Sequence, residues 1–439
     1  MPKQTMTFRA FIFFCATLVF LSSHPAYAQD IQPPEAFVGF KMGADYQLAR
    51  WGKIVDYFRH VDDRSDRVTV RELGKTTEGR PFIIAEISSP QTAADFTKYR
   101  YIQRKIADPR LIQGAEEERR LLTEGKTVLF INCNIHSSEI ASSQMALELL
   151  YDLAAGDSQD IREILASTII LLVPSANPDG LEMVIDWYER SIGKPWEGSG
   201  MPWAYHKYGG HDNNRDWFML NLQETRLSTK VLYGEWFPHI VYDIHQMGSG
   251  GVRYFVPPFF NPKATNMDPL TEHLILLTGG HMAAELTRAG KRGVVHSALY
   301  DNWWQGGFRS TVYRHNMVGL LTEAAGVRIA SPIFQVKSEL RGGIRGLDDY
   351  AMTVNFPDPW PGGWWRLRDI VEYEKISCMS IFTLAARYRE LFLSNTIKLA
   401  REAVERGGSV PPFAWLVPPD QRDTGSAIRM LEILQATGI

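Results

Sequence analysis

The sequence predicts an α/β protein with a mixed, mostly parallel central sheet covered by helices on both faces. Short runs rich in β-branched and apolar residues alternate along the chain with stretches of helical periodicity, the order expected when helices connect neighbouring strands. The runs are almost continuously apolar, as strands buried on both faces are. With 45% hydrophobic residues, the chain can bury one large core.

Residues 1–28 have the layout of a secretory signal peptide. Lys3 and Arg9 precede the apolar run FIFFCATLVF, and small residues end the segment at Ala26-Tyr27-Ala28. The apolar run is shorter than the about 20 residues that a membrane span needs. We therefore expect cleavage near Gln29, a secreted or periplasmic mature protein and no stable membrane insertion after cleavage. An uncleaved N-terminal anchor is the alternative.

Composition excludes two other classes of protein. The formal net charge of −3, without any basic block, argues against nucleic acid as a partner. Cys15 leaves with the signal peptide, so only Cys133 and Cys378 remain, which is too few for a disulfide framework. Two buried free thiols are the simpler expectation, and a single bridge stays open.

The predicted strands and helices follow one another through residues 29–390, which we expect to form one catalytic domain. Helical periodicity is visible around 140–154, 270–289 and 366–389. The predicted strands are PFIIAEIS (81–88), TVLFINCN (127–134), TIILLVPS (168–175), HIVYDIH (239–245) and VGLLTEA (318–324).

Polar side chains follow four of these strands where each one ends. In an open α/β sheet, ligands bind at the carboxyl ends of the strands, so residues far apart in sequence converge there. The side chains at the four ends are His136 and Glu139, Asn177 and Asp179, His245, and Glu323.

Two histidines and one glutamate in this set match a zinc site. A catalytic zinc ion takes three protein ligands and keeps one position for water. His136 and Glu139 lie within one turn of chain in HSSE, and His245 follows after a long spacer. We expect one Zn²⁺ per chain, although the same donors also accept cobalt or manganese.

Six motifs in order make the chain resemble the zinc carboxypeptidase family from about Gly74 to Glu323. They are GKTTEGRPF, HSSEIASS, NPDG, DNNRDW, DIH and LLTEAAG. The resemblance implies the zinc carboxypeptidase-like fold, with zinc held by His136, Glu139 and His245 and with Glu323 as general base or acid. It further implies that Asn214 and Arg215 bind a substrate's terminal carboxylate and that Asp212 orients His136.

Chemistry gives these roles independent reasons. A zinc ion lowers the pKa of its bound water and polarises a carbonyl, and a carboxylate such as Glu323 can take that water's proton. The planar guanidinium of Arg215 fits a carboxylate in bidentate fashion. Asp212 would accept the second ring proton of His136 and fix its tautomer.

Two further roles come from the resemblance alone. An arginine downstream of NPDG stabilises the oxyanion in related enzymes, and Arg190 in DWYERS is the candidate here. A tyrosine upstream of the catalytic glutamate closes over substrate, and we favour Tyr300 over Tyr313. His206 and His211 are expected to form loop hydrogen bonds rather than a second metal site.

The specificity pocket should lie between Tyr300 and Glu323, where Phe308 and Arg309 are the candidates. Residues 391–439 are expected to form a C-terminal helical extension, either docked on the catalytic domain or the start of a further domain.

Three functions fit these observations. The first is a carboxypeptidase acting on peptides, and the second is an amide hydrolase acting on peptidoglycan-derived stems through the same zinc site. They differ in whether the substrate needs a free terminal carboxylate. The third is an inactive peptide-binding module, which the presence of the ligands, Glu323 and Arg215 disfavours. The sequence contains neither GxSxG nor HExxH, which argues against serine hydrolases and zincins.

Overall fold

The computed structural model describes residues 2, 31–210 and 212–439. The predicted signal peptide and its cleavage site, and also His211, therefore lie outside the described residues. Among the described helices, none is long and apolar enough to cross a membrane.

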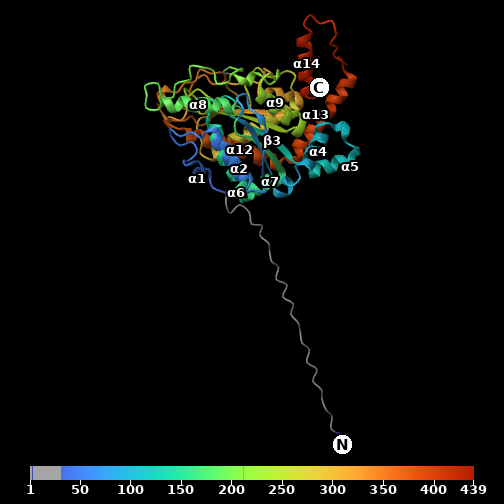
Figure 1. Ribbon diagram of the computed structural model, residues 1–439, viewed down its shortest axis with the longest axis horizontal. Coiled ribbons are helices and arrows are strands. Elements are labelled where there is room, and N and C mark those ends of the chain that lie inside the picture. The colour runs from blue at the N-terminus through green and yellow to red at the C-terminus, as the bar shows by residue number, and fades with distance from the viewer. Residues whose placement is uncertain (1, 3–30, 211) are drawn as a thin grey trace.

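A mixed sheet forms the centre of the molecule, as predicted (Figure 1). Within the described residues it has eight strands, in the spatial order β1-β2-β4-β3-β5-β8-β6-β7. The four central strands β4, β3, β5 and β8 run parallel, whereas β1, β2 and β6 pair antiparallel with their inner neighbours. The strands are β1 (Val68–Lys75), β2 (Pro81–Ile87), β3 (Thr127–Cys133), β4 (Thr168–Val173), β5 (Ile240–Met247), β6 (Tyr254–Phe255), β7 (Val294–Val295) and β8 (Val318–Ala325).

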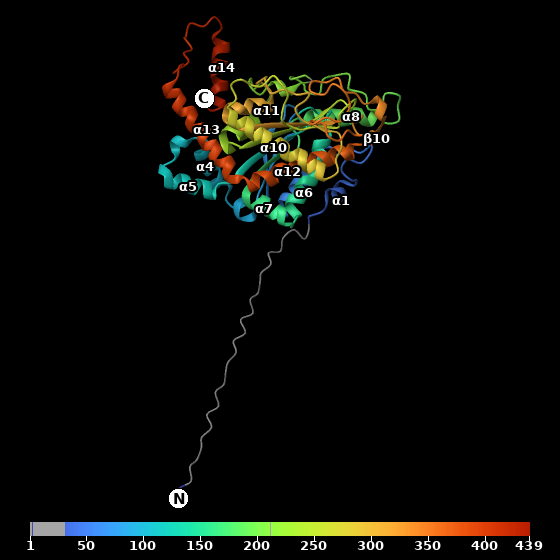
Figure 2. The ribbon, with the colours of Figure 1, turned by 180° about the vertical axis from the view of Figure 1, so that it is seen from behind.

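Helices cover both faces of this sheet (Figures 1 and 2). On one face α12 packs against its neighbours α6, α7 and α10, and α2 lies beside α6. This face carries α2 (Trp51–Asp62), α6 (Ala141–Ala155), α7 (Gln159–Ser167), α10 (Pro269–Arg288) and α12 (Leu367–Arg387). The other face carries α8 (Pro178–Ser191), α9 (Gln223–Lys230) and α11 (Phe308–Thr311). The faces on which these helices lie are those expected when parallel strands are joined by right-handed crossovers.

Local sequence explains why the central elements form. Every residue of β3 and of β4 is buried, because helices cover both faces of these strands. Asn177 caps α8 by accepting a hydrogen bond from the Gly180 N–H, and Pro178 occupies the first helical position, where its missing N–H costs nothing. Cys133 and Cys378 are both buried and unbridged, as the simpler expectation had it.

Smaller elements complete the periphery. A two-stranded antiparallel ribbon pairs β9 (Ile333–Val336) with β10 (Gly362–Trp365). The short or outer helices are α1 (Pro34–Val38), α3 (Pro90–Ala93), α4 (Phe96–Ala107) and α5 (Gly114–Glu124).

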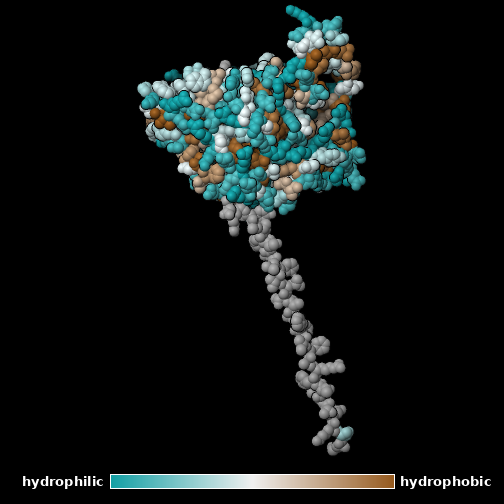
Figure 3. All heavy atoms as spheres, in the orientation of Figure 1, coloured by the Kyte–Doolittle hydropathy of each residue, from teal (hydrophilic) through white to brown (hydrophobic). Residues whose placement is uncertain are grey.

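The C-terminal part consists of α13 (Arg389–Ser409) and α14 (Thr424–Ala436). The expected boundary after residue 390 falls inside α13, because Leu393 and Ile397 pack on α4 and α5 in a small apolar cluster of their own. Beyond this anchored half the chain projects from the body as an arm (Figure 1). Apolar residues gather on that arm (Figure 3), and Trp415 is 87% exposed.

Candidate active site

The loop between β3 and α6 positions the first two candidate metal ligands. Asn134 follows β3 with a left-handed backbone (φ 54°), and its side-chain amide donates to the carbonyls of His136, Ser137 and Glu139 at 3.1–3.3 Å. The chain therefore curls around one buried amide. Gly180 of NPDG supports the loop from outside, since a Cβ atom there would lie 2.1 Å from Ser137 Oγ.

His136, Glu139 and His245 converge as predicted, with ligand atoms within 4.8 Å of one another. His136 Nδ1 lies 2.8 Å from Glu139 Oε1, and His245 Nδ1 lies 2.9 Å from Oε2 of the same carboxylate. Both histidines thus present the same ring nitrogen to a common point. Two imidazole nitrogens and a carboxylate are the donor set that zinc takes in hydrolytic sites, so these residues fit the ion.

A carboxylate lies behind each histidine. His136 Nε2 is 3.3 Å from Asp212 Oδ1, as the sequence predicted, and His245 Nε2 is 2.7 Å from Asp243 Oδ2. These contacts place the Nε2 proton on the carboxylate side and leave Nδ1 free to bind a metal. The sequence analysis missed Asp243, although it stands two residues before His245 in DIH and hence on the same face of a strand.

Electrostatics favour an ionised Glu139 and a protonated Glu323. Burial acts to raise the pKa of Glu139, but the charges and hydrogen bonds of the two histidines outweigh it and hold that pKa at about 2. For His136, burial acts to lower the pKa, while Glu139 and Asp212 raise it to about 9. Burial raises the pKa of Glu323 to about 8. A carboxyl group with a pKa near neutrality can both accept and deliver a proton.

Glu323 lies beside the ligands because β5 and β8 are adjacent parallel strands. Their register pairs His245 directly with Glu323, and paired residues of neighbouring strands point to the same face. Tyr300 lines the same cavity as Glu323, and burial, together with the charge of Glu323, raises the pKa of its phenol. Tyr313, the other candidate for the closing tyrosine, is buried elsewhere and donates to the Gly319 carbonyl.

One cavity of about 230 Å³ joins these residues to the segment between Tyr300 and Glu323. That volume is below the roughly 300–1,000 Å³ of common small-molecule sites, so it suits one amino-acid residue better than a longer segment. The residues lining it include His136, His245, Glu323, Tyr300, Asn214, Arg215, Trp304, Phe308 and Arg309.

Asn214 and Arg215 both line this cavity, but their side chains differ in how fully they are engaged in contacts within the protein. The Asn214 amide donates to Asp243 at 3.2 Å, and its oxygen accepts from the Phe308 N–H at 2.7 Å, so both ends are engaged within the protein. The side chain of Arg215 is 56% exposed, and its guanidinium donates to the Asn214 carbonyl at 2.8 Å, contacts Asp212 at 3.2 Å and lies over the Trp304 ring. Arg215 is therefore the freer of the two to bind a substrate carboxylate.

Arg190, the candidate for stabilising the oxyanion, is not brought together with the metal ligands. The structure places it, exposed, in the last turn of α8 and outside the cavity lining. The reason is geometric, because NPDG opens α8 and Arg190 lies twelve residues after Pro178, which at 1.5 Å per residue is roughly 18 Å along the helix axis. The oxyanion role of Arg190 stays a prediction that this position does not favour.

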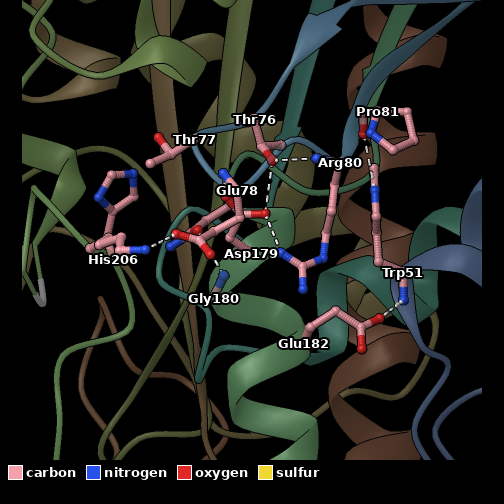
Figure 4. A network of polar contacts seen from close by, with 12 residues as sticks. Trp51, Thr76, Thr77, Glu78, Arg80, Pro81, Asp179, Gly180, Glu182 and His206 are labelled. Carbon is pink, nitrogen blue, oxygen red and sulfur yellow. Dashed lines mark hydrogen bonds and ion pairs between the residues drawn. The ribbon is translucent and has the colours of Figure 1, made fainter.

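A polar network fixes the motifs that flank the site (Figure 4). The buried carboxylate of Asp179 accepts hydrogen bonds from the Thr76 hydroxyl, the Glu78 N–H and Arg80, each at 2.7–2.8 Å. His206 contacts Glu224 at 3.3 Å, which confirms its expected structural role. Among the described residues, this network offers no second group of metal-binding side chains.

Comparisons with known proteins agree with the motifs. The zinc carboxypeptidase family model matches residues 54–232, which include His136, Glu139 and the stretch from Asp212 to Arg215. Among curated proteins, no sequence matches the chain.

Three of the solved structures that match the chain are a fibrinolysis inhibitor, a carboxypeptidase and an amidase by name. Thrombin activatable fibrinolysis inhibitor is 12% identical and aligns over 84% of this chain and 79% of its own, with a TM-score of 0.46. Carboxypeptidase A from Helicoverpa armigera is 12% identical over 84% and 80%, with a TM-score of 0.47. Murein-tripeptide amidase MpaA from Escherichia coli O157 is 12% identical over 59% and 83%, with a TM-score of 0.28.

The match over residues 54–232 contains the loop that carries two converging metal ligands and the carboxylate behind one of them. This stretch of the chain is accordingly similar to the zinc carboxypeptidase family, and the candidate site that it helps to form is that of a metallopeptidase.

Proposed function

We propose that the chain is an exported zinc carboxypeptidase, which releases the C-terminal residue of peptides with Glu323 as general base and acid. The observation that carries the proposal is that both histidines of the metal-binding triad, a buried carboxyl group and the partly exposed side chain of Arg215 border one residue-sized cavity. Export rests on the layout of residues 1–28.

Each residue has a definite task in this proposal. Arg215 binds the free terminal carboxylate, since its two N–H groups match the two oxygens. That contact holds the last peptide bond beside the triad. Zinc, when bound by His136, Glu139 and His245, would polarise the carbonyl and acidify a water molecule. Glu323 takes the proton from the attacking water and returns it to the leaving amine, which balances the protons over the cycle.

Tyr300 contacts the substrate in this proposal. It lines the cavity together with Glu323, and its ring packs on Phe255 with centroids 5.0 Å apart. A substrate residue that enters the cavity can therefore form a hydrogen bond with the Tyr300 hydroxyl, while the Glu323 carboxylate acts as base.

The test compares zinc content and peptide hydrolysis for the wild type, Glu323→Gln and Glu86→Gln. Glu86 is a matched control, because it is almost fully buried on β2, pairs with Arg71 and Arg100 and lies outside the cavity lining. We expect about one zinc ion in each protein. Loss of the general base should lower kcat by about 10²–10⁴-fold in Glu323→Gln, whereas folded Glu86→Gln should stay within about threefold of the wild type.

Substrate panels separate the candidate activities. Peptides with a free C-terminus should be trimmed and the same peptides with a C-terminal amide should not, because the amide cannot pair with Arg215. Equal cleavage of both would refute the carboxypeptidase proposal and favour an amide hydrolase. Metal binding without cleavage of any peptide would favour a binding role. For export, the mass of the mature protein recovered from the producing cells should correspond to a chain starting near Gln29.

A further inference from the structure

Three arginines among the described residues line the cavity, and they differ in their counter-charges. Arg215 contacts the carboxylate of Asp212 at 3.2 Å, and Arg345 contacts that of Asp301 at 2.9 Å. Arg309 forms no ion pair with any carboxylate in the described part of the chain. The cavity thus contains one cation whose charge is not balanced by a direct partner.

The contacts of Arg309 leave part of its guanidinium unused. Its Nη2 donates to the backbone carbonyl of Asp301, and the guanidinium lies 4.2 Å from the centroid of the Phe259 ring. Its Nη1 is buried and has no hydrogen-bond partner within residues 31–210 and 212–439. The neighbouring Tyr313 supplies no charge, since burial raises the pKa of its phenol. A buried donor without a partner is unfavourable, so a ligand that supplies an acceptor to Nη1 relieves that cost.

The backbone around Arg309 is held firmly. Phe308 is fully buried, and its N–H donates to Asn214. On the other side, the Arg309 carbonyl oxygen lies so close to Gly319 of β8 that a Cβ atom at position 319 would meet it at 1.7 Å. The guanidinium is therefore presented from a fixed base, which favours recognition of one particular group.

A carboxylate is the group that fits. It supplies both the counter-charge and two acceptor oxygens for the planar guanidinium. The terminal carboxylate of the substrate is already assigned to Arg215, so the second carboxylate has to come from the side chain of the same residue. A cavity of about 230 Å³ has room for one such residue.

We propose that Arg309 makes the cavity selective for a C-terminal residue with an acidic side chain, aspartate or glutamate. This inference rests on the proposed carboxypeptidase function and names its substrate class. A lysine or arginine side chain is disfavoured, because it would enter beside three guanidinium groups.

The first test needs only the wild-type protein and N-acylated dipeptides that end in Glu, Gln, Phe or Lys. Glutamate and glutamine have the same shape and differ in charge, so their ratio isolates the carboxylate. We expect kcat/KM to be at least about tenfold higher for Glu than for Gln, since a charge-assisted bidentate contact is lost with the amide. Free glutamate should also inhibit more strongly than free glutamine.

The second test assigns the preference to Arg309. In Arg309→Met the Glu/Gln ratio should fall to within about threefold of one, while Arg309→Lys should retain part of it through its remaining charge. The matched control is Arg314→Met, because Arg314 is exposed in the next turn and does not line the cavity. This control should keep the wild-type ratio.

The outcomes separate the two proposals. If no free-acid peptide is cleaved, the proposed function fails, and the acidic preference fails with it. If peptides are cleaved but Gln or Phe is released as fast as Glu, the preference is overturned and the carboxypeptidase function stands. An unchanged Glu/Gln ratio in folded Arg309→Met would show that another residue selects the substrate. If Arg309→Met does not fold, the wild-type ratio and Arg309→Lys still decide.

Discussion

Replacing Asp243 with asparagine tests how the site holds its third metal ligand. The Asp243 side chain is fully buried and accepts three hydrogen bonds. Oδ1 accepts from the Asn132 amide at 2.8 Å, while Oδ2 accepts from the Asn214 amide at 3.2 Å and from His245 Nε2 at 2.7 Å. All three neighbours are donors, so both oxygens are needed.

Asparagine offers His245 no carboxylate in either orientation. If its amide nitrogen faces Asn132, that residue can turn its own amide, since its Oδ1 has no partner, but His245 then meets a neutral oxygen in place of a charged one. If it is flipped, the nitrogen faces Asn214 and His245, and His245 loses the acceptor that orients its ring. Removing such an outer partner costs roughly 10–100-fold in metal affinity, or about 1.4–2.7 kcal/mol. The unsatisfied donor should also lower the stability of the metal-free protein by about 1–3 kcal/mol.

The assay titrates the metal-free protein with zinc against a competing chelator, so it does not depend on activity. Asp216→Asn is a matched control, because Asp216 is also buried but accepts only from the backbone N–H groups of Asn221 and Leu222. The Asp216→Asn protein should be less stable than the wild type, but its zinc affinity should stay within about threefold of the wild-type value. Wild-type zinc affinity in a folded Asp243→Asn protein would refute the role assigned to Asp243.

Three more predictions follow from the contacts outside the metal centre. Asp179→Ala should lower the free energy of unfolding by about 3 kcal/mol, because it leaves three donors without an acceptor; a loss below 1 kcal/mol in urea unfolding would contradict this. His239 is buried and accepts a hydrogen bond from the Val128 N–H, and burial lowers its pKa to about 3. Its contribution to stability is therefore complete above pH 6.5 and is lost at up to about 1.4 kcal/mol per pH unit as the pH falls toward 3. In His239→Asn, the free energy of unfolding should depend less steeply on pH over this range, and the difference in slope should correspond to one bound proton. Arg190→Ala should leave kcat/KM within about twofold of the wild type, and a large loss in peptide assays would restore Arg190 to the site.

The sequence sufficed for the central strands and the principal helices. All five predicted strands and all three predicted helices are present with ends shifted by at most two residues, because a sheet covered on both faces needs long apolar runs. The outer strands were harder. β1 mixes charged and apolar residues, and β6 and β7 have two residues each, too few to show any periodicity.

The candidate site was predictable where a side chain follows directly from the end of a strand. His136, Glu139, His245 and Glu323 belong to this group. Asp243 and Asn134 were not recognised, since their roles depend on contacts across strands and on one left-handed residue. The position of Arg190 was not predictable for a related reason, because spacing along the sequence does not show that a helix carries the residue away from the cavity.

The pairing of His245 with Glu323 has a consequence for how such an enzyme can diversify. The distance between a candidate metal ligand and the proposed proton-transferring group is set here by two hydrogen-bonded neighbouring strands, whose spacing is about 4.8 Å in any sheet. The segment that carries Arg309 and Trp304 lies outside that pairing, in the connection leading to β8. Substrate preference can therefore drift by substitution or insertion in the connection, while the distance on which the chemistry depends is inherited unchanged with the sheet.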